Sequence, residues 1–189
     1  MDEGIGSFLL TAPVPITDME TTRLARPYRR KPNRLAGYDY RQPGMSFVTL
    51  CRHDPRISFG EVVAGEMAPN DVGRMILTEW QALAVEVHGV DLGRVVVMPN
   101  HLHGVIVLGT NPEARSWPWL GEVVGRFRNA SNIRYFASVR DGLWSPIDKR
   151  VWPSRYYDRI VRNDRELERI RDCIAANPAR WEARRRGKW

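Results

Sequence analysis

The chain has 189 residues, of which 43% are hydrophobic and 10% aromatic, and its 29 basic and 22 acidic residues give a net charge of +7. This composition is that of an ordinary soluble domain, and a body of this size can fold without a disulfide or a structural metal. The 13 prolines follow no period, which excludes a coiled coil, a collagen-like repeat and a continuous helical bundle.

Cysteine usage and the absence of long apolar runs predict a cytoplasmic protein. Cys51 and Cys173 are too few for a disulfide framework and too far apart for a CxxC clip, which favours a reducing compartment. No stretch approaches the roughly 18 apolar residues of a membrane span, and Asp2 and Glu3 stand where a signal peptide carries basic charge. We therefore expect no membrane partner.

Positive charge is concentrated at the two ends of the chain. The net charge is +3 over residues 1–52, −3 over 53–148 and +7 over 149–189. In the first of these segments, eight basic residues are interleaved with tyrosines, a pattern typical of an arm that binds phosphates and stacks on bases. A solvated basic tail without a partner is the alternative.

The chain divides into three parts. Residues 1–32 contain prolines without apolar periodicity and are expected to form a flexible basic leader. We place the folded domain at residues 33–181 and a basic C-terminal tail at 182–189. The first element of the domain is a predicted strand at Ser46–Arg52, a β-branched and aromatic run between turn signals.

A helix is predicted over residues 70–88. Asn70 or Asp71 can cap its start, and Gly89 stops it. The apolar residues that recur at helical spacing are Val72, Met75, Ile76, Leu83 and Val87.

Two apolar runs, Arg94–Met98 and Gly104–Leu108, then predict a hairpin of neighbouring strands with both faces largely buried. A second helix is predicted over residues 119–138. Its apolar positions are Val123, Val124, Phe127, Ile133 and Phe136.

The last third of the chain predicts a loop over residues 141–153 and a short strand over 156–161. Asn163, followed three residues later by Glu166, resembles a capping box that opens a final helix, which Pro178 is expected to end. The order of the elements fits a ferredoxin-like α+β fold, a split βαβ sandwich with one central antiparallel sheet and helices on one face.

The densest chemical signal is His101-Leu102-His103. Residues two apart on an extended segment project to the same side, so both imidazoles can reach one metal ion, while Leu102 points into the core. Two unrelated polar residues at a hairpin tip are the alternative. On the final helix, Cys173 and Asn177 share a face distinct from the apolar stripe of Leu167, Ile170 and Ile174.

The segment Val97–Gly104 resembles the MPNHxH segment of the REP-associated tyrosine transposases and their insertion-sequence relatives, enzymes of the HUH class that act on single-stranded DNA. The resemblance spans about residues 33–181. It also covers Asn33-Arg34, Tyr38–Arg41, Phe47–Thr49, Phe59-Gly60, Gly125–Arg128, Val151-Trp152, Tyr156–Arg162 and Ile174–Pro178.

The resemblance implies an HUH transposase fold and a divalent ion, Mg²⁺ or Mn²⁺, held by His101, His103 and Asn177. In such enzymes the ion polarises the scissile phosphate. A tyrosine one helical turn before the carboxamide attacks the phosphorus, leaving a 5′-phosphotyrosine and a free 3′-OH. Residue by residue, this tyrosine position falls on Cys173.

Cys173 departs from the pattern of the family, because its side chain is much shorter than a tyrosine. A thiol is a competent nucleophile when Arg169, Arg171 or a metal lowers its pKa. The alternative is that Cys173 is a small, half-buried hydrophobe. Tyr156 or Tyr157 is a further candidate to replace the missing phenol.

Basic side chains are predicted to contact DNA phosphates, at Arg29, Arg30, Lys31, Arg34, Arg41, Arg126, Arg128 and Arg162. A solvated helix face is an equal alternative for the two on the second helix, and the run Arg184–Lys188 either grips phosphates or is disordered. Four tryptophans are candidates for stacking on unpaired bases, with core or loop anchoring as the alternative, namely Trp117, Trp119, Trp144 and Trp152. Packing is favoured for Trp152.

Three functions are compatible with these features. The first is a transposase-like protein that binds single-stranded or hairpin DNA and cleaves and rejoins it by metal-assisted transesterification. The second is a catalytically silenced DNA-binding descendant, as Cys173 suggests. The third, a ferredoxin-like RNA binder, ranks last because it needs exposed aromatics on the central strands, and Gly104–Leu108 has none. A monomer and a homodimer are both compatible with the resemblance.

Overall fold

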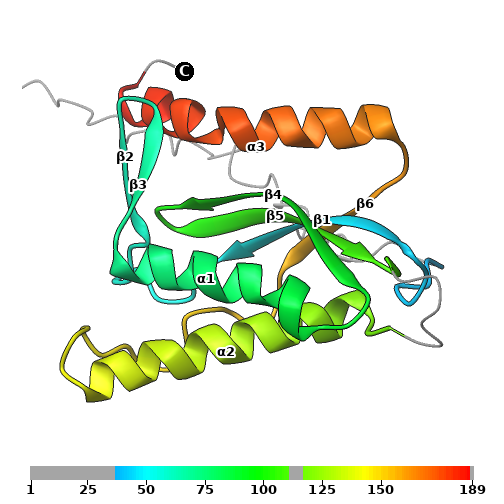
Figure 1. The fold of residues 1–189 in the computed structure, drawn as a ribbon. Helices are drawn as coiled ribbons and strands as arrows, with labels where there is room; N and C mark the ends of the chain where they lie inside the picture. The colour runs from blue at the N-terminus through cyan, green and yellow to red at the C-terminus, as the bar shows by residue number, and fades with distance from the viewer. Residues whose placement is uncertain (1–36, 111–116, 188–189) are drawn as a thin grey trace, which may run out of the picture. The chain divides into compact units, whose positions relative to one another are not determined.

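The computed structural model describes residues 37–110 and 117–187. They form six strands and three helices (Figure 1). In chain order these are β1 (Gly44–Cys51), β2 (Gly60–Val63), β3 (Glu66–Pro69), α1 (Asp71–Glu86), β4 (Val90–Met98), β5 (His101–Leu108), α2 (Leu120–Arg140), β6 (Tyr157–Val161) and α3 (Asp164–Arg185). The predicted leader lies outside the described residues. No described helix has both the length and the apolar character needed to cross a membrane.

Four strands form an antiparallel sheet in the order β4-β5-β1-β6, and β2 and β3 form a separate hairpin. The strands β1 and β5 are central. The two edge strands, β4 and β6, follow the helices α1 and α2 in the chain. This is a split βαβ arrangement with an added helix, so the predicted ferredoxin-like α+β fold class is confirmed.

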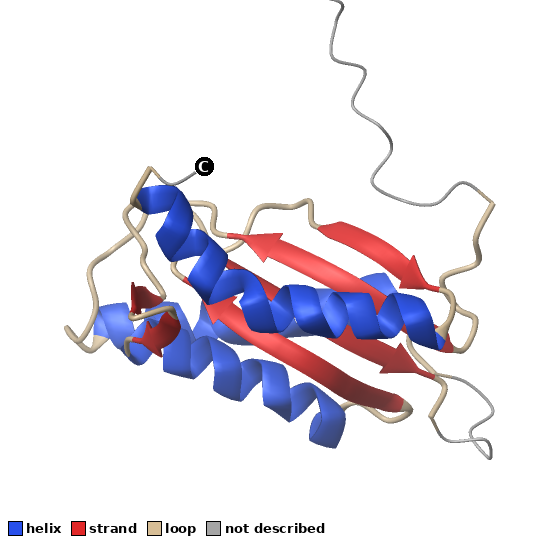
Figure 2. Ribbon diagram, turned by 90° about the horizontal axis from the view of Figure 1, so that it is seen from above, coloured by secondary structure: helices blue, strands red, loops and turns tan. Residues whose placement is uncertain are grey.

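Helices cover both faces of the sheet, and the prediction of helices on one face is wrong. α1 and α2 lie on one face, and α3 crosses the other (Figures 1 and 2). Side chains alternate along a strand, so Val48 and Leu50 of β1 join the core beneath α1 and α2, whereas Phe47 packs with Ile170 and Ile174 of α3. Both faces of the central strands are apolar, and each therefore needs a helical cover.

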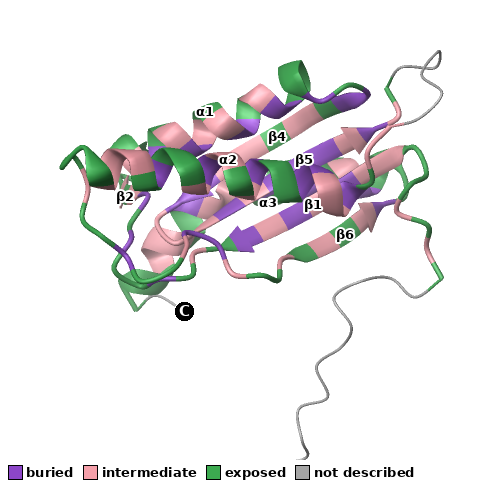
Figure 3. Ribbon diagram, turned by 90° about the horizontal axis from the view of Figure 1, so that it is seen from below, coloured by how far each residue is buried: buried purple, intermediate pink, exposed green. Residues whose placement is uncertain are grey.

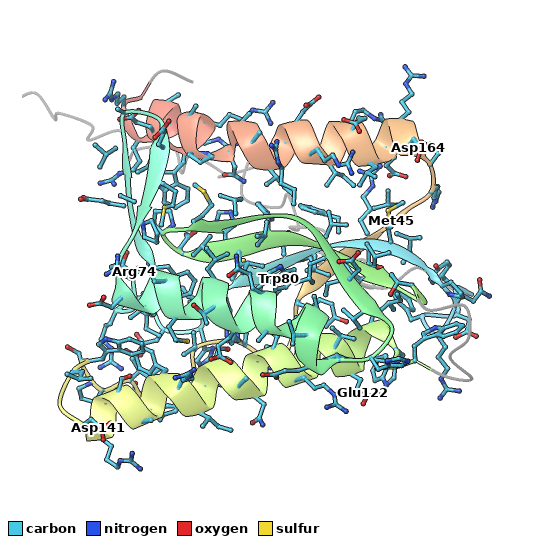
Figure 4. The ribbon with its side chains drawn as sticks, in the orientation of Figure 1. Met45, Arg74, Trp80, Glu122, Asp141 and Asp164 are labelled. Atoms are coloured by element: carbon cyan, nitrogen blue, oxygen red, sulfur yellow. The ribbon has the colours of Figure 1, made fainter. Side chains whose placement is uncertain are left out.

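The central strands carry the buried middle of the sheet (Figure 3). Trp80 of α1 lies between its helix and the sheet (Figure 4), directly against Gly104 of β5. A Cβ atom added to Gly104 would lie 2.3 Å from Cζ2 of Trp80. Trp80 also contacts Phe127 of α2 edge to face, with ring centroids 5.3 Å apart. Gly104 therefore allows α1 and α2 to approach β5.

The first two helices lie where they are predicted. Asn70 caps α1, its side chain accepting a hydrogen bond from the N–H of Gly73, and the chain reverses at Gly89, where φ is +76°. In α2, however, Ile133 and Phe136 are 62% and 37% exposed, so two of the predicted apolar positions face away from the core.

The prediction that the last helix ends at Pro178 is wrong, because α3 continues to Arg185. A proline in a helix interior costs about 3 kcal/mol, so the turns that follow need compensating contacts. Pro178 itself is buried. Gly65, in the turn of the β2–β3 hairpin, lies against Ala179. This hairpin is not predicted from the sequence. It packs on the turns of α3 that follow Pro178, which are not predicted as helix.

Candidate functional site

The two motif histidines lie side by side at the start of β5. His103 is opposite Thr49 of β1, and both histidines point to the face covered by α3. Leu102, between them, is fully buried on the opposite face, as predicted. The Nε2 atoms of His101 and His103 are 3.1 Å apart. The structure therefore brings the two imidazoles together.

Each imidazole is held by a hydrogen bond at its other nitrogen. The distance from Nδ1 of His103 to Oγ1 of Thr49 is 2.8 Å, and the distance from Nδ1 of His101 to Oδ1 of Asn100 is 2.6 Å. When Nδ1–H donates to these oxygens, the lone pair of each Nε2 faces the space between the rings. Such partners orient histidines for metal binding.

The donor set fits a divalent cation. With metal–nitrogen distances of ~2.1 Å, two adjacent ligands of one ion are about 3 Å apart. Burial lowers the pKa of His101 and of His103 to about 4, and the charge of His103 contributes to the shift at His101. Both rings are therefore neutral near pH 7, which is the form that binds a cation. Within the described ranges, no third His, Cys, Asp or Glu completes a metal-binding group.

The helix α3 brings Asn177 to the same side of the sheet. The ring of Trp181 lies 6.0 Å from the ring of His101, centroid to centroid. Asn177 is half-buried and precedes Trp181 by four residues, so the two share a face of the helix. The carboxamide predicted as the third ligand is thus carried by the helix face whose Trp181 contacts His101.

Cys173 is exposed, which corrects the expectation of a half-buried hydrophobe. It borders a pocket of about 190 Å³ together with Phe47 of β1 and side chains of β6 and α3. The ring of Phe47 is 5.2 Å from that of His103. One guanidinium nitrogen of Arg180 lies 3.8 Å from the sulfur. Cys173 therefore adjoins the histidine pair through Phe47.

Four of the predicted DNA contacts lie outside the described residues, namely Arg29, Arg30, Lys31 and Arg34. Arg41 and Arg162 are exposed. Arg126 is exposed as well, and it pairs with Glu122 one turn away on α2. Arg128 differs from them because it is half-buried.

The packing predicted for Trp152 is confirmed, because this residue is fully buried and donates its Nε1–H to Oγ of Ser131 at 2.8 Å. Trp144 packs against the ring of Tyr135, with centroids 5.2 Å apart. Trp117 donates its Nε1–H to the carbonyl of Arg41.

Several residues around the histidines received no role from the sequence. Asn100 directly precedes His101 and holds its ring. Its position next to the histidine could have indicated this role from the sequence. Thr49 and Phe47 reach His103 only through the pairing of β1 with β5. Trp181 lies beyond Pro178, in turns that are not predicted as helix.

The chain matches no established family model. It is 27% identical over 180 residues to an uncharacterised protein of Haemophilus influenzae, a match that covers 87% of this chain and 96% of that protein. It is similar in structure to a REP-associated tyrosine transposase solved with a bound REP hairpin. The TM-score is 0.51 at 15% identity, over 78% of this chain and 74% of that chain. This likeness confirms the predicted HUH transposase fold.

Proposed function

We propose that the protein binds single-stranded or hairpin DNA in the manner of an HUH transposase, with Mg²⁺ or Mn²⁺ held by His101 and His103. The observation that carries this proposal is the convergence of the two Nε2 atoms, 3.1 Å apart, on rings held at Nδ1. The fold supports it, because the transposase of similar structure is bound to a REP hairpin.

The residues around the pair have separate tasks in this proposal. Asn177 supplies an amide oxygen as the third ligand, and Thr49 and Asn100 keep both imidazoles oriented. Trp181 shields His101 from water. A divalent ion bound there would polarise a scissile phosphodiester. The exposed Arg41, Arg126 and Arg162, together with the basic leader, supply contacts to the DNA backbone.

In this proposal, whether the bound DNA is cut depends on a nucleophile beside the histidine pair. A thiolate at Cys173 is one candidate nucleophile. Tyr157, which is 62% exposed on β6 opposite Thr49, is another. The pocket of about 190 Å³ beside Cys173 favours the second function, a silenced DNA-binding descendant, because the short side chain leaves open a space that a larger one would occupy.

The test combines cleavage with binding. End-labelled single-stranded DNA that contains the hairpin repeats flanking the gene is incubated with the full chain and Mn²⁺ or Mg²⁺. Wild type is compared with His101→Ala, Cys173→Tyr, Cys173→Ser and Tyr157→Phe. Denaturing gels report cleavage and protein–DNA adducts, and fluorescence anisotropy reports binding.

Each outcome selects one function. Cleavage by wild type and not by His101→Ala indicates an active enzyme, and loss in Cys173→Ser or in Tyr157→Phe identifies the nucleophile. Cleavage by Cys173→Tyr alone indicates an intact scaffold that lacks its nucleophile. If wild type neither binds the DNA nor cleaves it, the proposal is wrong. Sedimentation of the same samples separates a monomer from a homodimer.

A further inference from the structure

Among the described residues, two arginines with a buried Nε atom stand out because neither forms an ion pair with a carboxylate. Arg128 projects from α2 and Arg150 from the loop before β6, and both are half-buried. The Nε atom of each is buried without a hydrogen-bond partner. Within residues 37–110 and 117–187, no carboxylate forms an ion pair with either guanidinium.

This arrangement is unfavourable for the protein alone. Asn132, one turn after Arg128 on α2, accepts the N–H of Val151, so the loop of Arg150 lies beside this part of the helix. Burial and the charge of Arg150 lower the pKa of Arg128, and Tyr156 raises it. A buried polar atom without a partner costs free energy, and two like charges add repulsion. Other arginines of the protein avoid both costs, as Arg56 does with Asp54. An anion between Arg128 and Arg150 would offset the repulsion between the two charges.

Both arginines are attached to rigid parts of the fold. Arg128 lies within α2 and donates to the carbonyl of Ser154 at 3.2 Å. Arg150 is followed by Val151, which is fully buried and donates its N–H to Oδ1 of Asn132 at 2.8 Å. The pair is therefore preorganised, unlike a basic tail, so little side-chain entropy is lost when an anion binds.

Backbone hydrogen bonds connect the loop that carries Arg150 to the turn before the histidine pair. The carbonyl of Val151 accepts from the N–H of His53 at 2.7 Å. The neighbouring residue, Arg52, donates its N–H to the carbonyl of Asn100 at 2.8 Å. Asn100 precedes His101 and holds its ring. Two backbone hydrogen bonds thus join the loop of Arg150 to the turn that carries the histidines.

We propose that Arg128 and Arg150 together bind one phosphodiester of the single-stranded DNA, at a contact separate from the phosphate held at the histidine site. This inference rests on the proposed function and adds to it a defined phosphate contact. Arg128 and Arg150 contribute equally to that contact. Guanidinium groups suit this task because their donors form a fixed fork that matches phosphate oxygens.

The test measures binding of a labelled single-stranded hairpin oligonucleotide to the full chain by anisotropy over a series of NaCl concentrations. Arg128→Gln and Arg150→Gln should each weaken binding about 10-fold and reduce the salt slope by about 0.7, the value for one phosphate of a single strand. The double variant should lose little more, because both arginines hold one phosphate. Arg140→Gln, an exposed position in the last turn of the same helix, is the matched control and should bind like wild type.

A second arm identifies the phosphate. Uncharged methylphosphonate linkages are introduced one at a time, and one position should weaken binding by wild type while leaving the double variant unaffected. The melting temperature of Arg150→Gln should equal or exceed that of wild type, whereas loss of a structural contact would lower it. The inference is overturned if both variants bind like Arg140→Gln, or if no linkage distinguishes wild type from the double variant. If wild type does not bind the DNA, the proposed function and this inference fail together.

Discussion

Gly104 shows how one residue without a side chain shapes the site. It lies next to His103 on β5 and leaves the space that the ring of Trp80 fills from the other face of the sheet. We expect Gly104→Ala to destabilise the protein by about 1–3 kcal/mol, because the added methyl group would overlap a ring that is enclosed on all sides. Urea denaturation followed by tryptophan fluorescence measures this change.

Gly125→Ala is the matched control for this substitution. Gly125 lies on the exposed side of α2, and nothing would lie within 4 Å of an added Cβ atom. This variant should be more stable than wild type by about 1 kcal/mol, because alanine favours a helix over glycine. Equal effects of the two substitutions would contradict the packing argument.

Thr49 is expected to matter for the metal and not for the fold. Thr49→Val keeps the shape of the side chain but removes the oxygen that lies 2.8 Å from Nδ1 of His103. Loss of such a partner lowers metal affinity about 10–100-fold. Titration calorimetry with Mn²⁺ measures the affinity. Thr49→Ser, which retains the hydroxyl, should bind Mn²⁺ like wild type, and identical affinities of the valine and serine variants would contradict this role.

At the scale of the element, the cap of α3 can be tested alone. Oδ1 of Asn163 accepts the N–H of Glu166 at 2.9 Å, which satisfies one of the free donors at the helix start. Asn163→Ala should cost about 1 kcal/mol of stability. Asn163→Asp should cost little, because its carboxylate accepts the same bond and suits the positive end of the helix dipole. Thermal unfolding compares the two variants, and an equal loss in both would exclude the cap.

The elements predicted from the sequence are those that local signals specify. The strands around His101-Leu102-His103 and the helix capped by Asn70 follow from apolar periodicity and turn residues. The β2–β3 hairpin lacks such a signal, because its strands have four residues each and its turn is Ala64-Gly65 in place of the usual Asn-Gly or Asp-Gly. Pro178 is a local stop signal that tertiary packing overrides.

The candidate site shows the same division. The spacing of His101 and His103 predicts their convergence, because it depends only on the strand. The partner of His103 is 54 positions away along the chain and depends on the register of β1 against β5. Whether Arg128 and Arg150 have ion-pair partners depends on which carboxylates the fold brings near them. This information cannot be predicted from the composition of the chain.

At the scale of the whole molecule, two buried carboxylates on separate elements link stability to pH. Asp54, after β1, accepts hydrogen bonds from the backbone and guanidinium of Arg56. Glu166 of α3 accepts from the guanidinium of Arg159 at 2.7 Å and from the N–H of Arg162 at 3.0 Å. These bonds hold the pKa of each carboxyl below its usual value.

The direction of the pH effect follows from these shifts. In the unfolded chain both carboxyls titrate near pH 4, whereas in the folded chain they stay ionised to lower pH. The unfolded state therefore takes up protons first as the pH falls. The stability that both groups contribute is fully present above about pH 5 and is lost progressively as the pH falls through their folded pKa values.

Glu166→Gln tests this link, because glutamine cannot titrate and makes a weaker bond to Arg159. The variant should be less stable than wild type at pH 7, and its urea midpoint should fall less than that of wild type between about pH 5 and pH 3. Glu168→Gln is the control, since Glu168 lies two residues away on α3, is 63% exposed and pairs with Arg171 on the surface. Its acid profile should follow that of wild type, because exposed ion pairs contribute little. If Glu166→Gln and wild type lose stability in parallel on acidification, the ionised carboxylate does not fix the start of α3 to β6.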